Sequence, residues 1–462
     1  MDSIWKKIEH KETILILGFG REGQSTYSFI RSYDTERVLT IADASESVRT
    51  HSLCVNDPHV RYITGRTYMS ELGTYDCVIK SPGISLSDAT LLELSGRLTS
   101  QAALFLEAFR DQTIGITGTK GKSTTSTFVH AALRASGLDA ILLGNIGVPP
   151  FEALSRITPE THIVFELSSH MLQTATVSPH IALILNIFPE HLDYYETMER
   201  YVASKANIFR FQKEDDVLVF DTNSAVLTAL DTFGTQARTV SWNTLSDSRH
   251  LFVPREEGKT LSIFDGSTET TFYDPSVKTP INGQHVLRGL TLAAVAACYA
   301  GADIVSATTA LGTFQGLPHR LENVGTWRGV TFINDSISTI PESALAALAA
   351  FPDTRVLILG GMDRGISYDA LTHLIRSRPE LCVLCIDETG ERIYAELMPY
   401  QGETKRYFLL DSLEQAVQKS YELLPDGGTV LLSPAAASYT QFKNFEERGK
   451  AFRDYALKYG VY

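Results

Sequence analysis

The sequence predicts an α/β protein of three domains: a Rossmann-like N-terminal domain, a central domain of the P-loop ATPase type and a Rossmann-like C-terminal domain. Short apolar runs alternate with amphipathic helical stretches over most of the 462 residues, a pattern typical of parallel sheets covered by helices. Two of these runs lead into glycine-rich turns followed by a helix, and the length suits about three domains. We place the domains at residues 1–110, 111–316 and 317–462.

Composition places the chain among ordinary enzymes. The formal net charge is −13, which argues against a nucleic-acid partner because phosphate backbones attract basic surfaces. The N-terminus lacks an apolar signal core, and the longest weakly polar run, 290–302, is too short to cross a membrane. We expect a cytoplasmic protein with no membrane partner, and we take it to act on small molecules as a monomer.

The five cysteines do not suggest a disulfide framework. Cys382 and Cys385 have the spacing of a redox pair, but they lie in the apolar run LCVLCID, which predicts a buried strand. No second pair or histidine cluster accompanies them in the sequence, so we favour the strand over a redox or metal site.

The first block resembles a dinucleotide-binding turn. A strand predicted at 13–17 is followed by Gly18, Gly20 and Gly23 and then by a helix, and a second strand ends at Asp43, 20 residues after Gly23. This is a Rossmann-like fingerprint. The glycines alone also suit a simple tight turn, and they do not identify the nucleotide, so a nicotinamide cofactor stays open. A further strand, DCVIK, leads into a turn that contains Ser81, Pro82 and Gly83.

The central block opens with GITGTKGKSTT, an apolar strand followed by a glycine loop and a helix start. Such a loop holds triphosphate oxygens with its N–H groups, while Lys122 reaches the β and γ oxygens and the Ser123 hydroxyl ligates Mg²⁺. The usual pattern has glycine five residues before Gly121, where this chain has Ile116. A tight turn with incidental Lys and Ser is the alternative. The predicted ATP-binding loop consists of Gly118, Thr119, Lys120, Gly121, Lys122, Ser123 and Thr124.

Polar residues follow the next strands of this block, where an open parallel sheet binds its ligand. Glu166 ends the strand HIVFE, and His191 follows the strand IALILN. Beside a triphosphate, a carboxylate suits Mg²⁺, and the histidine is a second candidate ligand; a purely structural role for both is the alternative. We expect the polar segment 215–279, including VLVF and LSIF, to form an antiparallel addition.

The third block contains four further strand candidates, GVTFIN, RVLILGG, LCVLCID and GTVLLSP. Thr339, with Pro341 and Glu342 behind it, predicts a capping-box helix start, and a final helix is expected at about 441–458. His319 with Arg320 and Asp335 supply a cation and an anion that suit phosphate, ribose or adenine groups; an inter-domain salt bridge is the alternative. The residues alone thus predict an ATP-dependent enzyme with a second nucleotide site and leave the acceptor open.

Six motifs in register make the chain similar to the Mur ligase family: GTKGKST, FELSSH, LNIFPEHLDYYETMERYVASK, GLPHRLE, FINDS and SPAAASYTQFKNFEERG. The last of these, with GFGREG and SPGI, resembles the branch that adds glutamate to UDP-N-acetylmuramoyl-L-alanine in peptidoglycan precursor synthesis. The resemblance implies that the substrate carboxylate takes the ATP γ-phosphoryl group, after which the glutamate amine displaces phosphate to form an amide. The activated carboxylate is needed because a free carboxylate is a poor acyl donor, and metal ions neutralise the crowded phosphates.

The resemblance also implies roles for individual residues. The catalytic residues would be Lys122, His191 and Lys205, the last as a carbamate. The metal ligands would be Ser123, Glu166, His191 and Lys205. From the third domain, His319, Arg320 and Asp335 would bind ATP, and Arg364, Ser438 and Phe445 would hold glutamate. The UDP-substrate would be bound by Gly18, Gly20, Gly23, Asp43, Ser81, Pro82, Gly83, Asn145 and Ser168.

Several positions depart from the family pattern. Val286 and Gly289 stand where the family often has an asparagine after the histidine of this helix and another asparagine one turn on, Ile337 replaces a lysine near the glutamate site, and Arg364 stands where lysine is usual. We favour D-glutamate as the acceptor; the ligase variant that uses L-glutamate is the nearest alternative. A folylpolyglutamate synthase-like ligase and a noncatalytic nucleotide-binding protein are the others, and the GFGREG-led first domain speaks against the former.

Overall fold

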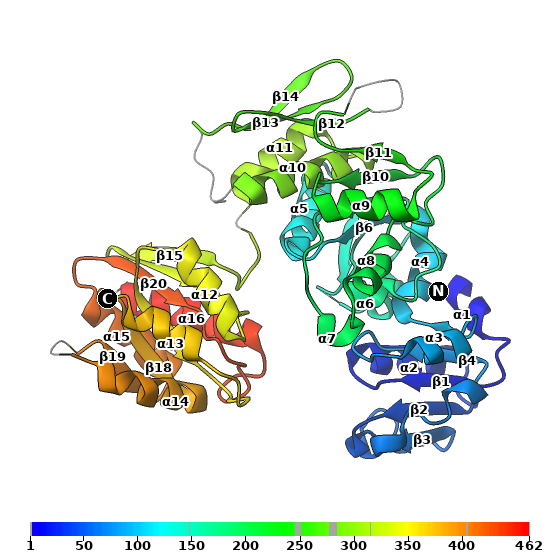
Figure 1. Ribbon diagram of the computed structural model, residues 1–462, viewed down its shortest axis with the longest axis horizontal. Helices are drawn as coiled ribbons and strands as arrows, with labels where there is room; N and C mark the ends of the chain where they lie inside the picture. Colours follow the sequence, from blue (N-terminus) through cyan, green and yellow to red (C-terminus); the bar gives the residue numbers. More distant parts are fainter. Residues whose placement is uncertain are drawn as a thin grey trace. The chain divides into compact units, whose positions relative to one another are not determined.

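A computed structural model describes residues 2–146, 148–244, 251–276, 284–314, 316–402 and 405–461. The chain divides into two compact units, Met1–Phe314 and Gln315–Tyr462, which are described separately (Figure 1). The predicted α/β class is confirmed: the three larger sheets are wholly or mainly parallel. The first unit holds the first two predicted domains, whose boundary at residue 110 stays a prediction.

The first sheet of the N-terminal unit has five parallel strands in the order β3-β2-β1-β4-β5. Its strands are β1 (Ile14–Leu17), β2 (Leu39–Asp43), β3 (Val60–Thr64), β4 (Cys77–Lys80) and β5 (Leu98–Thr99). Its helices are α1 (Asp2–Ile8), α2 (Arg21–Tyr33), α3 (Asp88–Glu93) and α4 (Gln101–Phe109). Apolar side chains alternate along each strand, so α2 and α4 cover one face and α3 the other.

The second sheet has six strands in the order β11-β10-β9-β6-β8-β7, all parallel. The strands are β6 (Thr113–Thr117), β7 (Ala140–Gly144), β8 (His162–Glu166), β9 (Ile181–Ile184), β10 (Val217–Phe220) and β11 (Arg238–Val240). The helices of this region are α5 (Lys122–Ala135), α6 (Ser169–Leu172), α7 (Leu192–Tyr195), α8 (Met198–Ala206), α9 (Ser224–Phe233), α10 (Gln284–Tyr299) and α11 (Ile304–Thr313). Helices α5, α10 and α11 pack on one face of the sheet.

The expectation that 215–279 forms an antiparallel addition is wrong for its first part. VLVF is β10, a parallel strand beside β9, because all four of its residues are buried in the sheet core. LSIF does lie in an antiparallel sheet, formed by β12 (Val253–Glu257), β13 (Thr260–Phe264) and β14 (Glu269–Tyr273).

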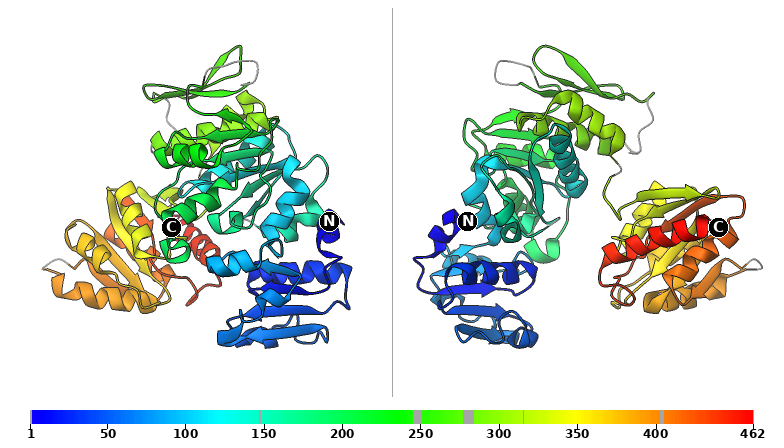
Figure 2. Two further views of the ribbon diagram at one scale, coloured as in Figure 1. Left: turned by 45° about the vertical axis from the view of Figure 1, so that its right-hand side comes forward. Right: turned by 180° about the vertical axis from the view of Figure 1, so that it is seen from behind.

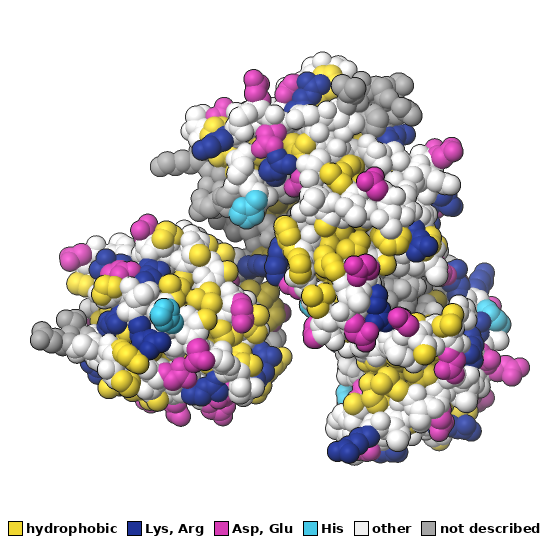
Figure 3. All heavy atoms as spheres, viewed as in Figure 1, with side chains coloured by type: hydrophobic (Ala, Val, Ile, Leu, Met, Phe, Trp, Pro, Cys, Tyr) yellow, Lys and Arg dark blue, Asp and Glu magenta, His cyan; other side chains and the backbone are white. Residues whose placement is uncertain are grey.

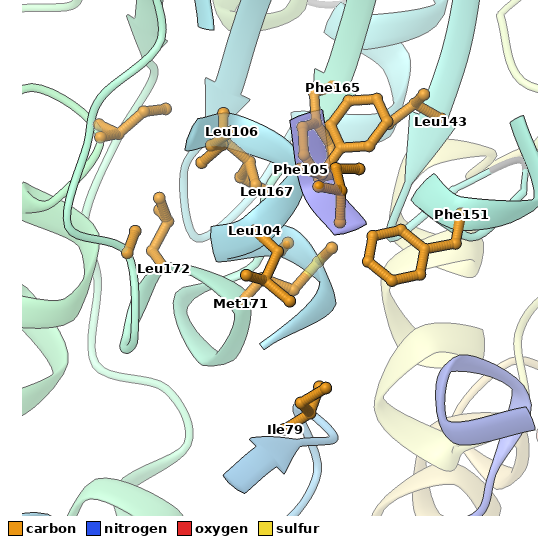
Figure 4. Close-up of a cluster of buried hydrophobic side chains, with 14 of the residues drawn as sticks. Ile79, Leu104, Phe105, Leu106, Leu143, Phe151, Phe165, Leu167, Met171 and Leu172 are labelled. Atoms are coloured by element: carbon orange, nitrogen blue, oxygen red, sulfur yellow. The ribbon is translucent and has the colours of Figure 1, made fainter. Parts of the chain in front are cut away.

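One apolar cluster joins the two parallel sheets of the first unit. Figure 4 shows Phe105 of α4 among side chains of the second sheet, including Phe165, and its ring centroid lies 5.5 Å from that of Phe165. The same cluster includes Ile79 of the first sheet. Because burying such rings is strongly favourable, the two sheets share one core.

The C-terminal unit is a six-stranded sheet in the order β15-β16-β20-β17-β18-β19, in which only β15 pairs antiparallel. Its strands are β15 (Glu322–Trp327), β16 (Val330–Asn334), β17 (Thr354–Gly360), β18 (Cys382–Ile386), β19 (Tyr407–Leu410) and β20 (Gly428–Leu432). Helices α12 (Pro341–Ala350), α13 (Asp369–Arg376) and α14 (Asp387–Leu397) cover one face. Helices α15 (Leu413–Leu423) and α16 (Phe445–Gly460, red in Figure 2) cover the other.

Two predicted helix starts in this unit are wrong. Helix α12 begins at Pro341 with Ile340 at the cap position and no side-chain cap, so Thr339 lies one residue too early for its hydroxyl to reach the first N–H groups. Helix α16 begins at Phe445, because the Asn444 side chain accepts a hydrogen bond from the Glu447 N–H and caps it there. The cysteine run is β18, as predicted, and both of its thiols are free.

Candidate active site

The predicted phosphate loop connects β6 to α5. Gly121, at the cap position of α5, has φ of +86° and no side-chain cap, so the first N–H groups of the helix are left for a ligand. The loop is held in shape by Asn186, whose Oδ1 accepts from the Lys120 N–H at 2.8 Å and whose Nδ2 donates to the Lys120 carbonyl at 3.1 Å. The Thr119 hydroxyl lies 2.9 Å from the Tyr201 hydroxyl. Ser123 and Thr124 fall in the first turn of α5.

Two lysines converge on this loop. The Lys122 ammonium donates to the Gly118 carbonyl at 2.9 Å and to the Thr119 carbonyl at 3.1 Å, and Lys205 of α8 donates to the same Gly118 carbonyl at 2.9 Å. Lys205 is 1% exposed. Burial, and then the nearby Lys122, hold the pKa of Lys205 well below its usual value. The structure therefore brings these two predicted catalytic residues together over the loop.

Glu166 lies at the end of β8 and is completely buried. Its Oε1 accepts a hydrogen bond from the Asn145 amide at 2.8 Å, while its Oε2 is buried without a partner among the described residues. A buried carboxylate oxygen with no partner is costly unless a ligand occupies it. Asn145, predicted to line the UDP-substrate, thus also orients Glu166.

His191 lies at the N-cap position of α7 without a side-chain cap bond and is half-exposed, and its ring centroid lies 4.8 Å from that of His170. Burial, followed by the positive charges of His191, Lys80 and Lys205, lowers the pKa of His170 to about 4. Glu190 accepts from the Lys120 ammonium at 2.6 Å, and its other oxygen lies 3.9 Å from His191 Nε2.

The side chains at this edge of the sheet supply only some of the oxygen ligands that a hard cation such as Mg²⁺ requires. Over the described ranges, no group of three or more His, Cys, Asp and Glu side chains is arranged to hold a metal ion. The unpartnered Glu166 oxygen and the Ser123 hydroxyl are donors of the type that Mg²⁺ prefers. The protein donors present thus fit Mg²⁺ if phosphate oxygens complete the coordination.

Three predicted segments of the first sheet meet at the carboxyl ends of its strands. The Ser81 hydroxyl donates to the Gly18 carbonyl at 3.0 Å, and Asp43 accepts from the N–H groups of Phe19 at 2.7 Å and Ser45 at 2.8 Å. A Cβ on Gly23 would lie 2.1 Å from the Gly18 carbonyl oxygen, so the close approach of loop and helix requires glycine. A Cβ on Gly20 or Gly83 would meet open space.

The remaining predicted residue of the UDP-substrate group, Ser168, lies after β8. Its hydroxyl accepts a hydrogen bond from the Met171 N–H at 3.2 Å and caps the short helix α6. The turn that contains Pro82 contributes its carbonyl to the Lys80 ammonium at 3.3 Å.

In the C-terminal unit, Asp335 is 3% exposed and accepts hydrogen bonds from the Ser338 and Ser433 hydroxyls. Burial raises the pKa of Asp335 to about 6. The His319 ring nitrogen Nδ1 lies 3.0 Å from the Asn334 amide, and Arg320 is exposed. His319 and Asp335 therefore lie on the same edge of the sheet, at the end of β16.

Of the three predicted glutamate-binding residues, Arg364 follows β17, Ser438 lies between β20 and α16, and Phe445 is the first residue of α16. Ser438 is buried, and Arg364 is exposed with its guanidinium donating to the Thr339 carbonyl at 3.1 Å. The Phe445 carbonyl accepts from the Ser336 hydroxyl at 2.8 Å, and its ring centroid lies 6.3 Å from that of His319.

Comparison with known proteins shows the family of this chain. The model of the Mur ligase middle domain matches residues 116–298, and the model described as "Mur ligase, glutamate ligase domain" matches 319–436. The UDP-N-acetylmuramoylalanine--D-glutamate ligase of Acetivibrio thermocellus is 33% identical, over 97% of each chain. This chain belongs to the Mur ligase family.

Other relatives of this Mur ligase differ in the acceptor they are named for. The UDP-N-acetylmuramoyl-L-alanine--L-glutamate ligase of Xanthomonas euvesicatoria is 32% identical, over 96% of this chain and 95% of the relative. Among solved structures, MurF of Acinetobacter baumannii superposes with a TM-score of 0.58 at 14% identity, covering 95% of this chain and 93% of that one. MurF of Thermotoga maritima, solved with ADP, gives 0.52 at 16% identity, covering 97% and 95%. These structures share the fold.

Sequence reasoning missed a buried polar group beside the predicted turn at residues 81–83 of this Mur ligase. Lys80, at the end of β4, is buried, and its ammonium donates to the Ile84 carbonyl at 2.8 Å and to the Tyr194 hydroxyl at 3.0 Å. Burial lowers the pKa of Lys80 to about 8, and burial raises that of Glu22 to about 7 against the attraction of Lys80. The only sequence signal for this group is that Tyr194 lies three residues after His191.

Surface features of this Mur ligase add little to the site. Figure 3 shows basic and acidic side chains interspersed on the visible face of the molecule. Within the part of the chain that the structure describes, no helix combines the length and the apolar character needed to cross a bilayer.

Proposed function

We propose that this chain is an ATP-dependent ligase that joins D-glutamate to UDP-N-acetylmuramoyl-L-alanine in peptidoglycan precursor synthesis. The observation that carries the proposal is the phosphate loop with Lys122 and Lys205 on one carbonyl, beside the unpartnered oxygen of Glu166. Family membership adds ATP-dependent amide-bond formation to this geometry. A folylpolyglutamate synthase-like or noncatalytic role is not favoured by these relatives.

The reaction follows from the chemistry of a carboxylate. An oxygen of the terminal alanine carboxylate attacks the γ-phosphorus of ATP, and ADP leaves with the bond electrons. The glutamate nitrogen then attacks the acyl carbon, phosphate leaves, and the nitrogen loses a proton to give the amide. Loop residues 118–124 would hold the triphosphate through backbone N–H groups, with the Lys122 charge on its β and γ oxygens.

A bound Mg²⁺ would neutralise phosphate charge near the attacking carboxylate. Ser123, Glu166, His191 and Lys205 are the residues that we propose as its ligands. A buried lysine beside a second ammonium is driven toward its neutral amine, whose nitrogen can attack CO₂, form an N–C bond and release a proton. The resulting carbamate would turn Lys205 into an anion.

Residues 1–110 are proposed to bind the UDP portion of the substrate. The segments at Gly18, Asp43 and Ser81 meet at one edge of the sheet, where ligands of open α/β sheets bind. The start of α2 has no side-chain cap and offers N–H groups to a diphosphate. Residues 111–316 would then form the ATP domain, and a monomer suffices for the reaction.

Residues 317–462 are proposed to take part in binding both ATP and glutamate. His319, Arg320 and Asp335 would contact ATP. Arg364, Ser438 and Phe445 would hold the amino acid, because a guanidinium, a hydroxyl and backbone N–H groups suit a dicarboxylate.

The choice of D-glutamate rests on the relatives. Six of the similar curated proteins are named for D-glutamate and two for L-glutamate, at 31% and 32% identity. Phosphate release with UDP-N-acetylmuramoyl-L-alanine, ATP and each enantiomer in turn tests the proposal. A clear preference for L-glutamate would overturn the choice of enantiomer, and no release with either would overturn the ligase assignment.

A further inference from the structure

Arg448 of α16 is the largest fully buried side chain in the described structure, at 1% exposure. Its Nε donates to the Ser336 hydroxyl at 3.0 Å, and one terminal nitrogen donates to the carbonyls of Ser336 at 2.8 Å and Ala436 at 3.0 Å. The other terminal nitrogen lies 3.5 Å from the Gly360 carbonyl. Arginine buried this deeply is rare unless it is paired.

The acceptors of Arg448 belong to three neighbouring strands. Ser336 follows β16, Ala436 follows β20 and Gly360 ends β17, and the sheet order is β16-β20-β17. The guanidinium therefore holds in place, by hydrogen bonds, the loops at the carboxyl ends of three adjacent parallel strands. Such an edge is where open α/β sheets bind ligands.

No carboxylate of the described residues contacts the Arg448 guanidinium directly, although the charge of Asp387 lies close enough to oppose the lowering of its pKa by burial. Across the described residues, none lies within ion-pair distance of its guanidinium, and its acceptors are three carbonyls and one hydroxyl. Burial lowers the pKa of Arg448 to about 10, opposed by Asp387, so the group stays charged at neutral pH. A buried cation that Asp387 compensates only without direct contact is still costly, and an anionic ligand at this edge would offset part of that cost.

The contacts of Arg448 reach the loops that are proposed to bind glutamate. The Ser336 hydroxyl that accepts from Arg448 donates to the Phe445 carbonyl at 2.8 Å. Ala436 lies two residues before Ser438, and a Cβ on Gly361 would lie 3.2 Å from the guanidinium. One side chain thus fixes the backbone that carries two of the proposed glutamate-binding residues.

We propose that Arg448 is the positioning residue of the amino-acid pocket, and that its charge, which no carboxylate contacts directly, selects an acceptor whose side chain carries a carboxylate. This inference rests on the proposed function. Arg448 acts on the acceptor through the geometry of these loops and through its field, since four contacts of its guanidinium already go to the loops.

The test compares Arg448→Met, Arg448→Lys and the wild type, each assayed for phosphate release with glutamate and with glutamine. In Arg448→Met the KM for glutamate should rise at least about tenfold, since a charge acts strongly across a buried site, while the KM values for ATP and the UDP-substrate stay unchanged. The preference for glutamate over glutamine in kcat/KM should fall by a similar factor. Arg448→Lys should retain much of that preference.

Arg378→Met is the matched control. Arg378 also donates to backbone carbonyls, those of Pro352 and Thr354, but at the amino end of β17. Its loss should lower stability without changing the glutamate preference. If Arg448→Met does not fold, Arg448→Lys and Ser336→Ala carry the test: Ser336→Ala should raise the KM for glutamate and leave the preference over glutamine intact.

The outcomes separate the two proposals. A glutamate-active wild type whose preference over glutamine is unchanged in Arg448→Met, or is lost as fully in Arg448→Lys as in Arg448→Met, would overturn the role of Arg448 alone. A wild type that uses a neutral acceptor in place of glutamate would overturn the selection of an anion. A wild type with no acceptor-dependent phosphate release would contradict the proposed function, and the inference with it.

Discussion

Removing the ammonium of Lys122 should abolish turnover with little loss of stability. In the structure this group donates to the carbonyls of Gly118 and Thr119, and each such bond contributes at most about 1.5–3 kcal/mol, less here because the Lys122 side chain is partly exposed. Repulsion from Lys205 on the same carbonyl offsets part of this. In catalysis, loss of a charge that stabilises the transferring phosphoryl group lowers the rate at least about a hundredfold, or about 2.7 kcal/mol.

The assay is phosphate release by purified Lys122→Ala at saturating substrates, with a thermal melt of the same sample. Lys419→Ala is the control, since Lys419 is paired with Glu422 at 2.7 Å on the surface of α15. The variant at position 122 should melt within a few degrees of the wild type and show at most about one hundredth of its rate. Phosphate release close to that of the wild type from folded Lys122→Ala would refute the catalytic role of the loop.

Three further predictions test other parts of the site. Lys205→Ala should be nearly inactive and partly restored by added acetate, which supplies the lost anion; full activity without acetate would count against a carbamate. Gly23→Ala should weaken calorimetric binding of the UDP-substrate at least about tenfold, because the new Cβ would meet the Gly18 carbonyl, whereas unchanged affinity, or binding of NAD by the wild type, would contradict a UDP site. Burial raises the folded-state pKa of Asp335 to about 6, above its ordinary value of 3.8. The protonated carboxyl therefore contributes its full stability below about pH 4. As the pH rises through 6, the free energy of unfolding should fall by about 3 kcal/mol. The melting temperature of Asp335→Asn should therefore rise relative to the wild type between pH 4 and 7, and a constant difference would show that the carboxyl does not titrate as argued.

Local patterns predicted the sheets and the phosphate loop well. Strands such as β6 and β8 are continuous buried apolar runs, which is how parallel strands covered on both faces read in sequence. Two strands of the C-terminal unit were missed because they lie at the edges of its sheet: β15 is a partly exposed antiparallel edge strand, and β19 is a short edge strand. The helix start predicted at Thr339 was wrong by one residue, because a sequence pattern locates a helix start only to within one or two residues.

The contacts that organise the site were beyond local patterns because they join distant positions. Lys80 meets Tyr194 across 114 residues of sequence, and Arg448 meets Ser336 across 112. From the sequence alone, a lysine or arginine is expected at the surface, because these residue types are rarely buried. Only the fold, by bringing strand ends together at one edge, shows that these cations are buried.

The most direct measurement of the central claim is the rate of phosphate release with ATP, Mg²⁺ and UDP-N-acetylmuramoyl-L-alanine, with and without D-glutamate, read together with the mass of the product. The account predicts release that depends on both the UDP-substrate and D-glutamate, and a product heavier than the substrate by one glutamyl residue. Release without either of these substrates, or a product of unchanged mass, would contradict it.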